Sequence, residues 1–284
     1  MIFLTDETLA IGCHSEVGIL LWNMTDASER VLQPSRGRLA VSPDRQTLAF
    51  STTQTITLWD IATSQKRALL SGHAERIMSL AFSPDGRRVA SASASTLMIW
   101  DVSSARRIAV QTLATPVYRV AFSPDGSKLV TGGNGATNAT RDPASGKLLR
   151  QLDNPVSSHS IHALAFTSDG RLVAMGTNAG VINVHDTSTG AIRLSLKGHT
   201  DEVFGLAFFP DNRTLLSGSN DGSVRFWDTQ YGQERMTLTD HGFPVAGVAI
   251  SKDGGTIAAA SSDGDVKLWH ASSGKEALDR KSTP

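Results

Sequence analysis

The sequence predicts an all-β fold, a seven-bladed β-propeller in which each blade is a four-stranded antiparallel sheet. Three observations lead to this fold: tryptophans recur at a spacing of about 40 residues, turn motifs recur in phase with them, and short apolar or alternating segments lie between the turns. The repeat runs through nearly the whole chain of 284 residues. We therefore expect a single propeller domain over residues 1–284.

The tryptophan ladder gives the number of blades. Besides the five tryptophans, two positions of the repeat carry Arg141 and His185 in place of tryptophan, and an aspartate follows each. The seven positions are spaced by 37, 41, 41, 44, 42 and 42 residues, which is the length of a propeller blade. The tryptophans are Trp22, Trp59, Trp100, Trp227 and Trp269. The expected blades are 1–33, 34–70, 71–113, 114–153, 154–196, 197–238 and 239–280, followed by a tail at 281–284.

A turn motif recurs in six of the repeats and marks where strands reverse. One full copy is Ser83-Pro84-Asp85-Gly86. Proline fixes φ at the second position of a tight turn, and Asp-Gly accepts the left-handed conformation that follows. An apolar segment precedes the turn, as at 77–82, and an alternating segment such as 224–227 follows later in the repeat. Each repeat is therefore expected to be a four-stranded meander. The motifs lie at 42–44, 83–86, 123–126, 167–170, 210–212 and 252–254.

The first blade departs from this pattern at its inner strand. Residues 3–6 align with residues 82–85, so half of that strand is absent and we expect the first blade to be clipped. This suggests the hypothesis that the native product extends upstream, or that the chain is the propeller part of a longer protein.

Composition excludes several classes of partner. The 27 basic and 27 acidic residues give a formal net charge of zero, so no electrostatic field favours nucleic acid or an anionic membrane.

The single cysteine, Cys13, excludes an internal disulfide framework. The N-terminal residues carry neither a basic region nor a long apolar stretch, so we expect no secretory signal or membrane anchor and a cytoplasmic location.

The sixth repeat carries the fullest set of motifs. Gly198-His199 opens it, Phe209-Pro210-Asp211 forms its first turn, Ser217 to Gly222 its second corner, and Trp227-Asp228 closes its third strand. These residues resemble the WD-repeat β-propeller family, and the resemblance covers nearly all of the chain. It implies that His199, Ser217, Asp221 and Trp227 form the structural tetrad of that family, in which histidine bridges aspartate and serine, and serine reaches the indole N–H.

The same residue types could form a Ser/His/Asp nucleophile. We favour a buried hydrogen-bond network, because the group would lie inside a sheet rather than in a cleft. We therefore expect no catalytic residue and no enzymatic activity. Five of the eight histidines occupy repeat positions, and the only cysteine is in the first blade, so neither a metal nor another cofactor is expected.

Other repeats depart from the tetrad. Blade seven has Ala259 where serine is expected, blade three lacks the aspartate, and blade four has Arg141 at the tryptophan position. We expect these blades to be held less firmly than blade six.

The resemblance also implies a partner-binding face, formed by the loops and by residues that flank the first apolar position of each inner strand. Aromatic and methionine residues there are typical of interface centres. Arg36, Arg38, Arg76 and Arg119 could attract an acidic peptide. Alternatively, these side chains pack against neighbouring strands or are merely solvated. The candidate face residues are Arg76, Met78, Tyr118, Arg119, His162, Glu202, Phe204 and Asn220.

Three functions remain open from the sequence. The first is a non-catalytic protein-protein interaction scaffold that binds a protein or peptide on this face. The second is a small-ligand binder or enzyme that uses the central channel, where Arg119 and His162 are the plausible reactive groups and no carboxylate companion is evident. The third is a regulatory propeller module of a larger protein. Fold alone does not choose among them.

Overall fold

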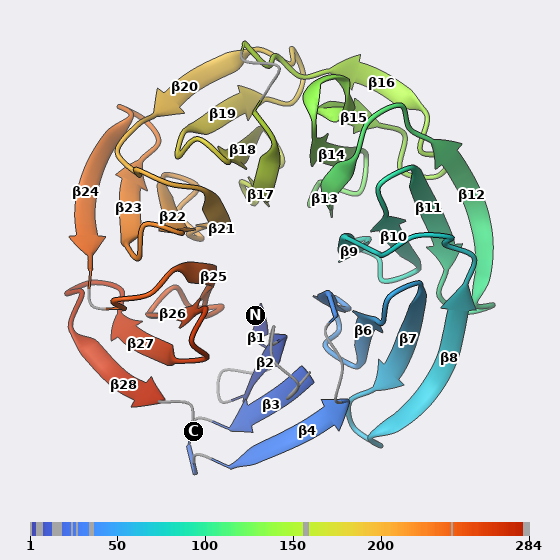
Figure 1. The fold of residues 1–284 in the computed structure, drawn as a ribbon, viewed down its shortest axis with the longest axis horizontal. Helices are drawn as coiled ribbons and strands as arrows, with labels where there is room; N and C mark the ends of the chain where they lie inside the picture. Colours follow the sequence, from blue (N-terminus) through green and yellow to red (C-terminus); the bar gives the residue numbers. More distant parts are fainter. Residues whose placement is uncertain are drawn as a thin grey trace. The chain divides into compact units, whose positions relative to one another are not determined.

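The computed structural model describes residues 2–3, 8–12, 19–23, 25–26, 28–33, 37–155, 159–239 and 241–280. The described residues form seven sheets of four antiparallel strands, and within each sheet the strands follow one another in sequence order (Figure 1). The predicted all-β architecture of seven four-stranded blades is confirmed, and we number the blades one to seven along the chain. The first strand of blade one spans two residues, so the clipped strand is also confirmed.

The chain divides into two compact units, Met1–Ser157 and Ser158–Pro284. Blades one to four belong to the first unit. Its strands are β1 (Ile2–Phe3), β2 (Thr8–Gly12), β3 (Ile19–Asn23), β4 (Glu29–Gln33), β5 (Leu39–Val41), β6 (Thr47–Ser51), β7 (Thr55–Asp60), β8 (Gln65–Ser71), β9 (Ser79–Phe82), β10 (Arg88–Ala92), β11 (Thr96–Asp101), β12 (Arg106–Thr112), β13 (Val117–Phe122), β14 (Leu129–Gly133), β15 (Ala139–Arg141) and β16 (Leu148–Gln151), with a short 3₁₀ turn, η1 (Gly135–Thr137).

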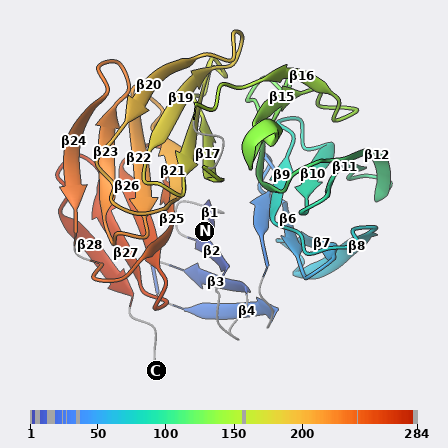
Figure 2. The same ribbon diagram turned by 45° about the horizontal axis from the view of Figure 1, so that its top comes forward.

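Blades five to seven belong to the second unit. Its strands are β17 (Ile161–Phe166), β18 (Leu172–Thr177), β19 (Ile182–Asp186), β20 (Ile192–Leu196), β21 (Val203–Phe208), β22 (Thr214–Ser219), β23 (Val224–Asp228), β24 (Gln233–Leu238), β25 (Val245–Ile250), β26 (Thr256–Ser261), β27 (Val266–His270) and β28 (Glu276–Arg280). Figure 2 shows these strands from a second direction.

Neighbouring blades within each unit meet along their first strands. In the first unit β9 packs against β5 on one side and β13 on the other, and in the second unit β21 packs against β17 and β25. The second strands are the most buried: every residue of β22 is buried, whereas the fourth strand of a blade, such as β8, is mostly exposed. The first strands therefore bring equivalent positions of successive blades together.

The hydrophobic core lies between neighbouring blades. One cluster joins Ile56 and Leu58 of blade two to Ile77 and Trp100 of blade three, and similar clusters join blades three and four, five and six, and six and seven. Both faces of an inner strand meet a neighbouring sheet, so second strands such as β6, β14 and β22 are buried along their whole length and do not alternate between a buried and an exposed face. None of the described residues belongs to a helix long and apolar enough to span a membrane.

The turn motif has a common hydrogen-bond pattern. The Ser83 hydroxyl donates to Asp85 Oδ1 at 2.5 Å, and the backbone N–H of Arg88 donates to Ser83 Oγ at 2.9 Å. The hydroxyls of Ser42, Ser123 and Ser251 make the same contact with the aspartate two residues later. Side chains therefore satisfy backbone groups at the corner, which fixes where each first strand ends.

Candidate functional site

The tetrad residues of blade six form a chain of hydrogen bonds inside the sheet. His199 Nδ1 lies 2.8 Å from Asp221 Oδ2, and His199 Nε2 lies 2.7 Å from Ser217 Oγ. The indole N–H of Trp227 donates to Ser217 Oγ at 2.7 Å. A neutral histidine protonated at Nδ1 satisfies this arrangement, because Nδ1 then donates to the carboxylate and Nε2 accepts from the serine hydroxyl.

Burial separates this group from a nucleophilic triad. Ser217 is 0% exposed and its oxygen already accepts from Trp227, so no substrate atom can approach it. Burial lowers the pKa of His199, while Asp221 opposes the shift. Burial alone would raise the pKa of Asp221, but hydrogen bonds from Ser223 and His199 outweigh it and lower that pKa to about 2. The group is a neutral histidine beside a carboxylate in a closed sheet.

Blade three reaches the same arrangement with a different acceptor. His73 Nε2 lies 2.6 Å from Ser91 Oγ, which also accepts from the Trp100 indole at 2.8 Å. The missing aspartate is replaced by Thr96, whose hydroxyl lies 3.0 Å from His73 Nδ1. Sequence reasoning missed Thr96. The signal was present, because Thr96 lies four residues before Trp100, as Ser223 lies four residues before Trp227 in blade six, where Ser223 Oγ lies 3.2 Å from His199 Nδ1.

Blade four replaces the tryptophan with a guanidinium. Arg141 Nε donates to Thr131 Oγ1 at 3.0 Å, as an indole N–H would, and Nη1 donates to the Gly146 carbonyl at 3.3 Å. The Thr131 hydroxyl in turn donates to the Thr137 carbonyl at 2.5 Å. Burial lowers the pKa of Arg141. The loss of tryptophan therefore does not leave the blade without its buried hydrogen bond.

Blade seven lacks the central hydroxyl. Ala259 pairs with Lys267, as Ser217 pairs with Arg225 in blade six, so the two residues occupy equivalent positions. The Trp269 indole is fully buried, and its N–H has no hydrogen-bond acceptor among the residues that the structure describes. His241 and Trp269 still pack edge to face, with ring centroids 5.3 Å apart.

The predicted face residues of the second unit lie in contact with one another. His162 Nδ1 lies 3.8 Å from Glu202 Oε2, and the His162 ring lies 5.6 Å from that of Phe204. Asn220 donates its backbone N–H to the Glu202 carbonyl at 2.8 Å and its side-chain amide to Asp201 Oδ2 at 2.8 Å. The expectation that His162 has no carboxylate companion was wrong, because blade six places Glu202 beside blade five. The two groups are in contact at 3.8 Å, and they form an ion pair only when the imidazole is protonated.

The predicted face residues of the first unit have less contact with each other. Tyr118 and Arg119 lie in β13, where Arg119 Nη1 donates to the Tyr118 carbonyl at 2.8 Å and Asn134 Nδ2 donates to the Tyr118 hydroxyl at 3.4 Å. Arg76 is exposed, and Met78 is half-buried just before β9. Each unit thus contributes four of the eight candidate face residues.

Comparison with known proteins identifies the family. A family model described as "IFT122 first beta-propeller" matches residues 37–282. The chain belongs to this family. The crystal structure of the Cps50 (Swd1) β-propeller domain from Myceliophteria thermophila is similar, with a TM-score of 0.75, 21% sequence identity and coverage of 86% of each chain. A search of the curated proteins returned no match. The WD-repeat propeller predicted from the sequence is confirmed.

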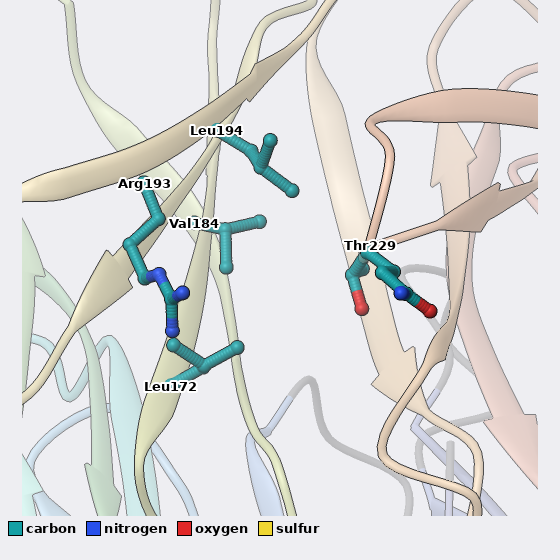
Figure 3. Close-up of a pocket in the computed structure, with 6 residues that line it drawn as sticks. Leu172, Val184, Arg193, Leu194 and Thr229 are labelled. Carbon is teal, nitrogen blue, oxygen red and sulfur yellow. The ribbon is translucent and has the colours of Figure 1, made fainter.

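The second unit of this WD-repeat propeller contains a cavity of about 370 Å³ between blades five and six (Figure 3). Leu172, Val184 and Leu194 supply an apolar wall, and Arg193 extends beside them. No residue of the first strands β17 and β21 lines it.

A cavity of about 350 Å³ lies at the equivalent place between blades six and seven. Each residue of the first cavity has a counterpart 42 residues later in the second, and the pairs are Leu172 and Thr214, Val184 and Phe226, Arg193 and Arg235, Leu194 and Met236, Thr229 and Ala271, and Gln230 and Ser272. The recurrence indicates a gap that the repeat itself creates between blades, rather than a dedicated ligand site.

Within the described ranges, no three or more His, Cys, Asp or Glu side chains gather in a group that could hold a metal ion. Cys13, His14 and Arg36 lie outside the described residues.

Proposed function

We propose that this propeller is a non-catalytic protein-protein interaction scaffold that binds a protein or peptide through the candidate face residues of its two units. The observation that carries the proposal is the cluster of His162, Glu202, Phe204 and Asn220, which joins an aromatic ring to polar groups and leaves all four side chains partly accessible. Such a mixture is typical of interface centres. We propose further that residues 1–284 form one domain that acts in the cytoplasm and that binds no cofactor, metal, nucleic acid or membrane.

The burial of the Ser217 hydroxyl supports a binding role over a catalytic one. Ser217 is enclosed in its sheet, and its oxygen already accepts from the Trp227 indole. A scaffold needs only a rigid, partly apolar surface, which the stacked blades supply.

Affinity capture from the native source tests the proposal. The bait is the wild-type propeller, compared with a Tyr118→Ala, Phe204→Ala double variant. A Leu149→Ala, Tyr231→Ala variant is the matched control, because those side chains are 56% and 62% exposed and are not among the candidate face residues. We expect partners that wild type and control retain and the face variant loses. Identical capture by all three proteins would contradict the assigned face, and no specific capture by any of them would contradict the scaffold.

A further inference from the structure

One position of the repeat carries arginine in two blades of the first unit. It lies four residues before the turn motif, and its occupants are Arg38, Ser79 and Arg119 in blades two to four. In blades five to seven the same position holds small residues, Ala163, Gly205 and Gly247. A long cationic side chain at this position is therefore a property of this chain's second and fourth blades and is not required by the repeat.

The backbone brings these positions together. Arg38 immediately precedes β5, and its N–H donates to Ser51 Oγ at 2.9 Å. The strand β9 packs between β5 and β13, and Ser79 Oγ accepts the N–H of Val120 at 3.1 Å. Arg119 directly precedes Val120. Two arginines thus flank the small hydroxyl of Ser79, and Arg76 lies three residues before it.

The three guanidinium groups influence one another electrostatically. Burial and, as the smaller cause, the positive charge of Arg38 together lower the pKa of Arg119 to about 9. Burial and the charge of Arg76 lower the pKa of Arg38. All three groups remain charged at neutral pH, so the cluster holds three like charges.

No carboxylate in the described part of the chain neutralises this cluster. None of the ion pairs between described residues includes Arg38, Arg76 or Arg119. The nearest acidic residue in sequence, Glu75, instead accepts from the N–H and hydroxyl of Ser95 at 2.9 and 2.8 Å. Arg76 is exposed and the other two arginines are half-buried, so a ligand can reach them.

We propose that Arg38, Arg76 and Arg119 bind a phosphorylated side chain of a protein partner. The inference rests on the proposed scaffold function and names the chemistry that one part of the face recognises. A phosphate carries nearly two negative charges and three acceptor oxygens, and therefore can accept from several guanidinium groups at once. A single carboxylate would neutralise only one of the three charges. Arginine clusters without acidic partners are suited to this kind of recognition.

Fluorescence anisotropy with three peptide pools tests the inference. Each pool contains labelled nine-residue peptides of degenerate sequence, with phosphoserine, glutamate or serine fixed at the centre. We expect the phosphoserine pool to bind at least about tenfold more tightly than the glutamate pool, and the serine pool not to bind. Equal binding of all three pools, or no binding of the phosphoserine pool, would overturn the site. Inorganic phosphate is the competitor, and competition at the concentration where the peptide binds would assign the site to free phosphate and overturn docking.

Variants separate the site from general charge effects. Arg38→Gln and Arg119→Gln should each weaken binding of the phosphoserine pool at least about tenfold. Arg171→Gln removes the same charge from a side chain that is 85% exposed and remote from the cluster in sequence, and should leave binding unchanged. Both site variants should melt at or above the temperature of wild type, because each removes a like-charge repulsion. Lower melting with unchanged peptide binding would mean that the arginines serve the fold and would overturn the inference.

The capture experiment distinguishes the two proposals. If an Arg38→Gln, Arg119→Gln variant captures the same partners as wild type while the Tyr118→Ala, Phe204→Ala variant loses them, the scaffold stands and the phosphate site is wrong. If the peptide pools behave as expected but no protein is captured, the scaffold assignment is wrong.

Discussion

We expect the Ala259→Ser substitution to stabilise the protein. The Trp269 indole is 0% exposed, and its N–H has no acceptor among the described residues. Blade six shows what a serine provides at this position, because Ser217 Oγ accepts from the Trp227 indole at 2.7 Å. An unpaired buried donor costs about 1–3 kcal/mol. The new hydroxyl must itself lose hydration, so the expected net gain in the free energy of unfolding is about 1 kcal/mol, or about 2 °C in melting temperature for a chain of this size.

Urea titration followed by tryptophan fluorescence measures the gain, and a double-mutant cycle assigns it. In a Trp269→Phe background the indole N–H is absent, so Ala259→Ser should no longer stabilise. The reverse change in blade six, Ser217→Ala, should destabilise by about 1–3 kcal/mol because Trp227 then loses its acceptor. The reasoning is refuted if Ala259→Ser lowers the free energy of unfolding, or raises it equally in the Trp269→Phe background.

Two further predictions concern blades three and four. Burial lowers the pKa of His73 from 6.5 to about 4. Between these pH values only the unfolded state binds the proton, so the contribution of the neutral histidine to stability is complete above pH 6.5 and is lost as the pH falls toward 4. At about 1.4 kcal/mol per pKa unit, wild type should lose about 2–3 kcal/mol more than His73→Asn between pH 7.5 and 4.5 in urea titrations, and parallel pH profiles would contradict this. In blade four, Thr131→Ala removes the acceptor of the buried Arg141 Nε and should lower the free energy of unfolding by about 1–3 kcal/mol in the same assay. Thr131→Ser keeps the hydroxyl and should lower it by less than about 1 kcal/mol. Equal losses of stability in the two variants would show that the hydroxyl has no role.

Regular features of the repeat were predictable because local chemistry determines them. The tryptophan spacing and the Ser-Pro-Asp-Gly turns each follow from steric and hydrogen-bond preferences of a few consecutive residues, and the structure has the corresponding seven sheets. In blade six the full set of tetrad residue types is present, and the structure places His199, Ser217, Asp221 and Trp227 in hydrogen-bond contact. Their role as a structural rather than a catalytic group remains a proposal.

Substitute partners were not predictable from residue types aligned to a single pattern. Thr96 takes the role of an aspartate in blade three because its hydroxyl reaches His73 from the start of the third strand. Arg141 takes the role of a tryptophan because its Nε–H can be directed at the same hydroxyl as an indole N–H. The blades share a hydrogen-bond donor or acceptor at the same place inside the sheet, and different side chains reach that place from different backbone positions. Contacts between blades, such as His162 with Glu202, depend on stacking and leave no local sequence signal.

Departures from the repeat therefore have two different causes, which the hydrogen bonds separate. At Thr96 and Arg141 the unusual side chain satisfies a buried polar group, so the fold itself accounts for it. Arg119 Nη1 donates to the carbonyl of the neighbouring Tyr118, but neither Arg38 nor Arg119 has an acidic partner in the described part of the chain, and the two place like charges near one another. Ser79, Ala163, Gly205 and Gly247 show that smaller residues fit this repeat position. Because the fold gains nothing evident from these charges, a ligand that neutralises them is the more economical explanation for their presence.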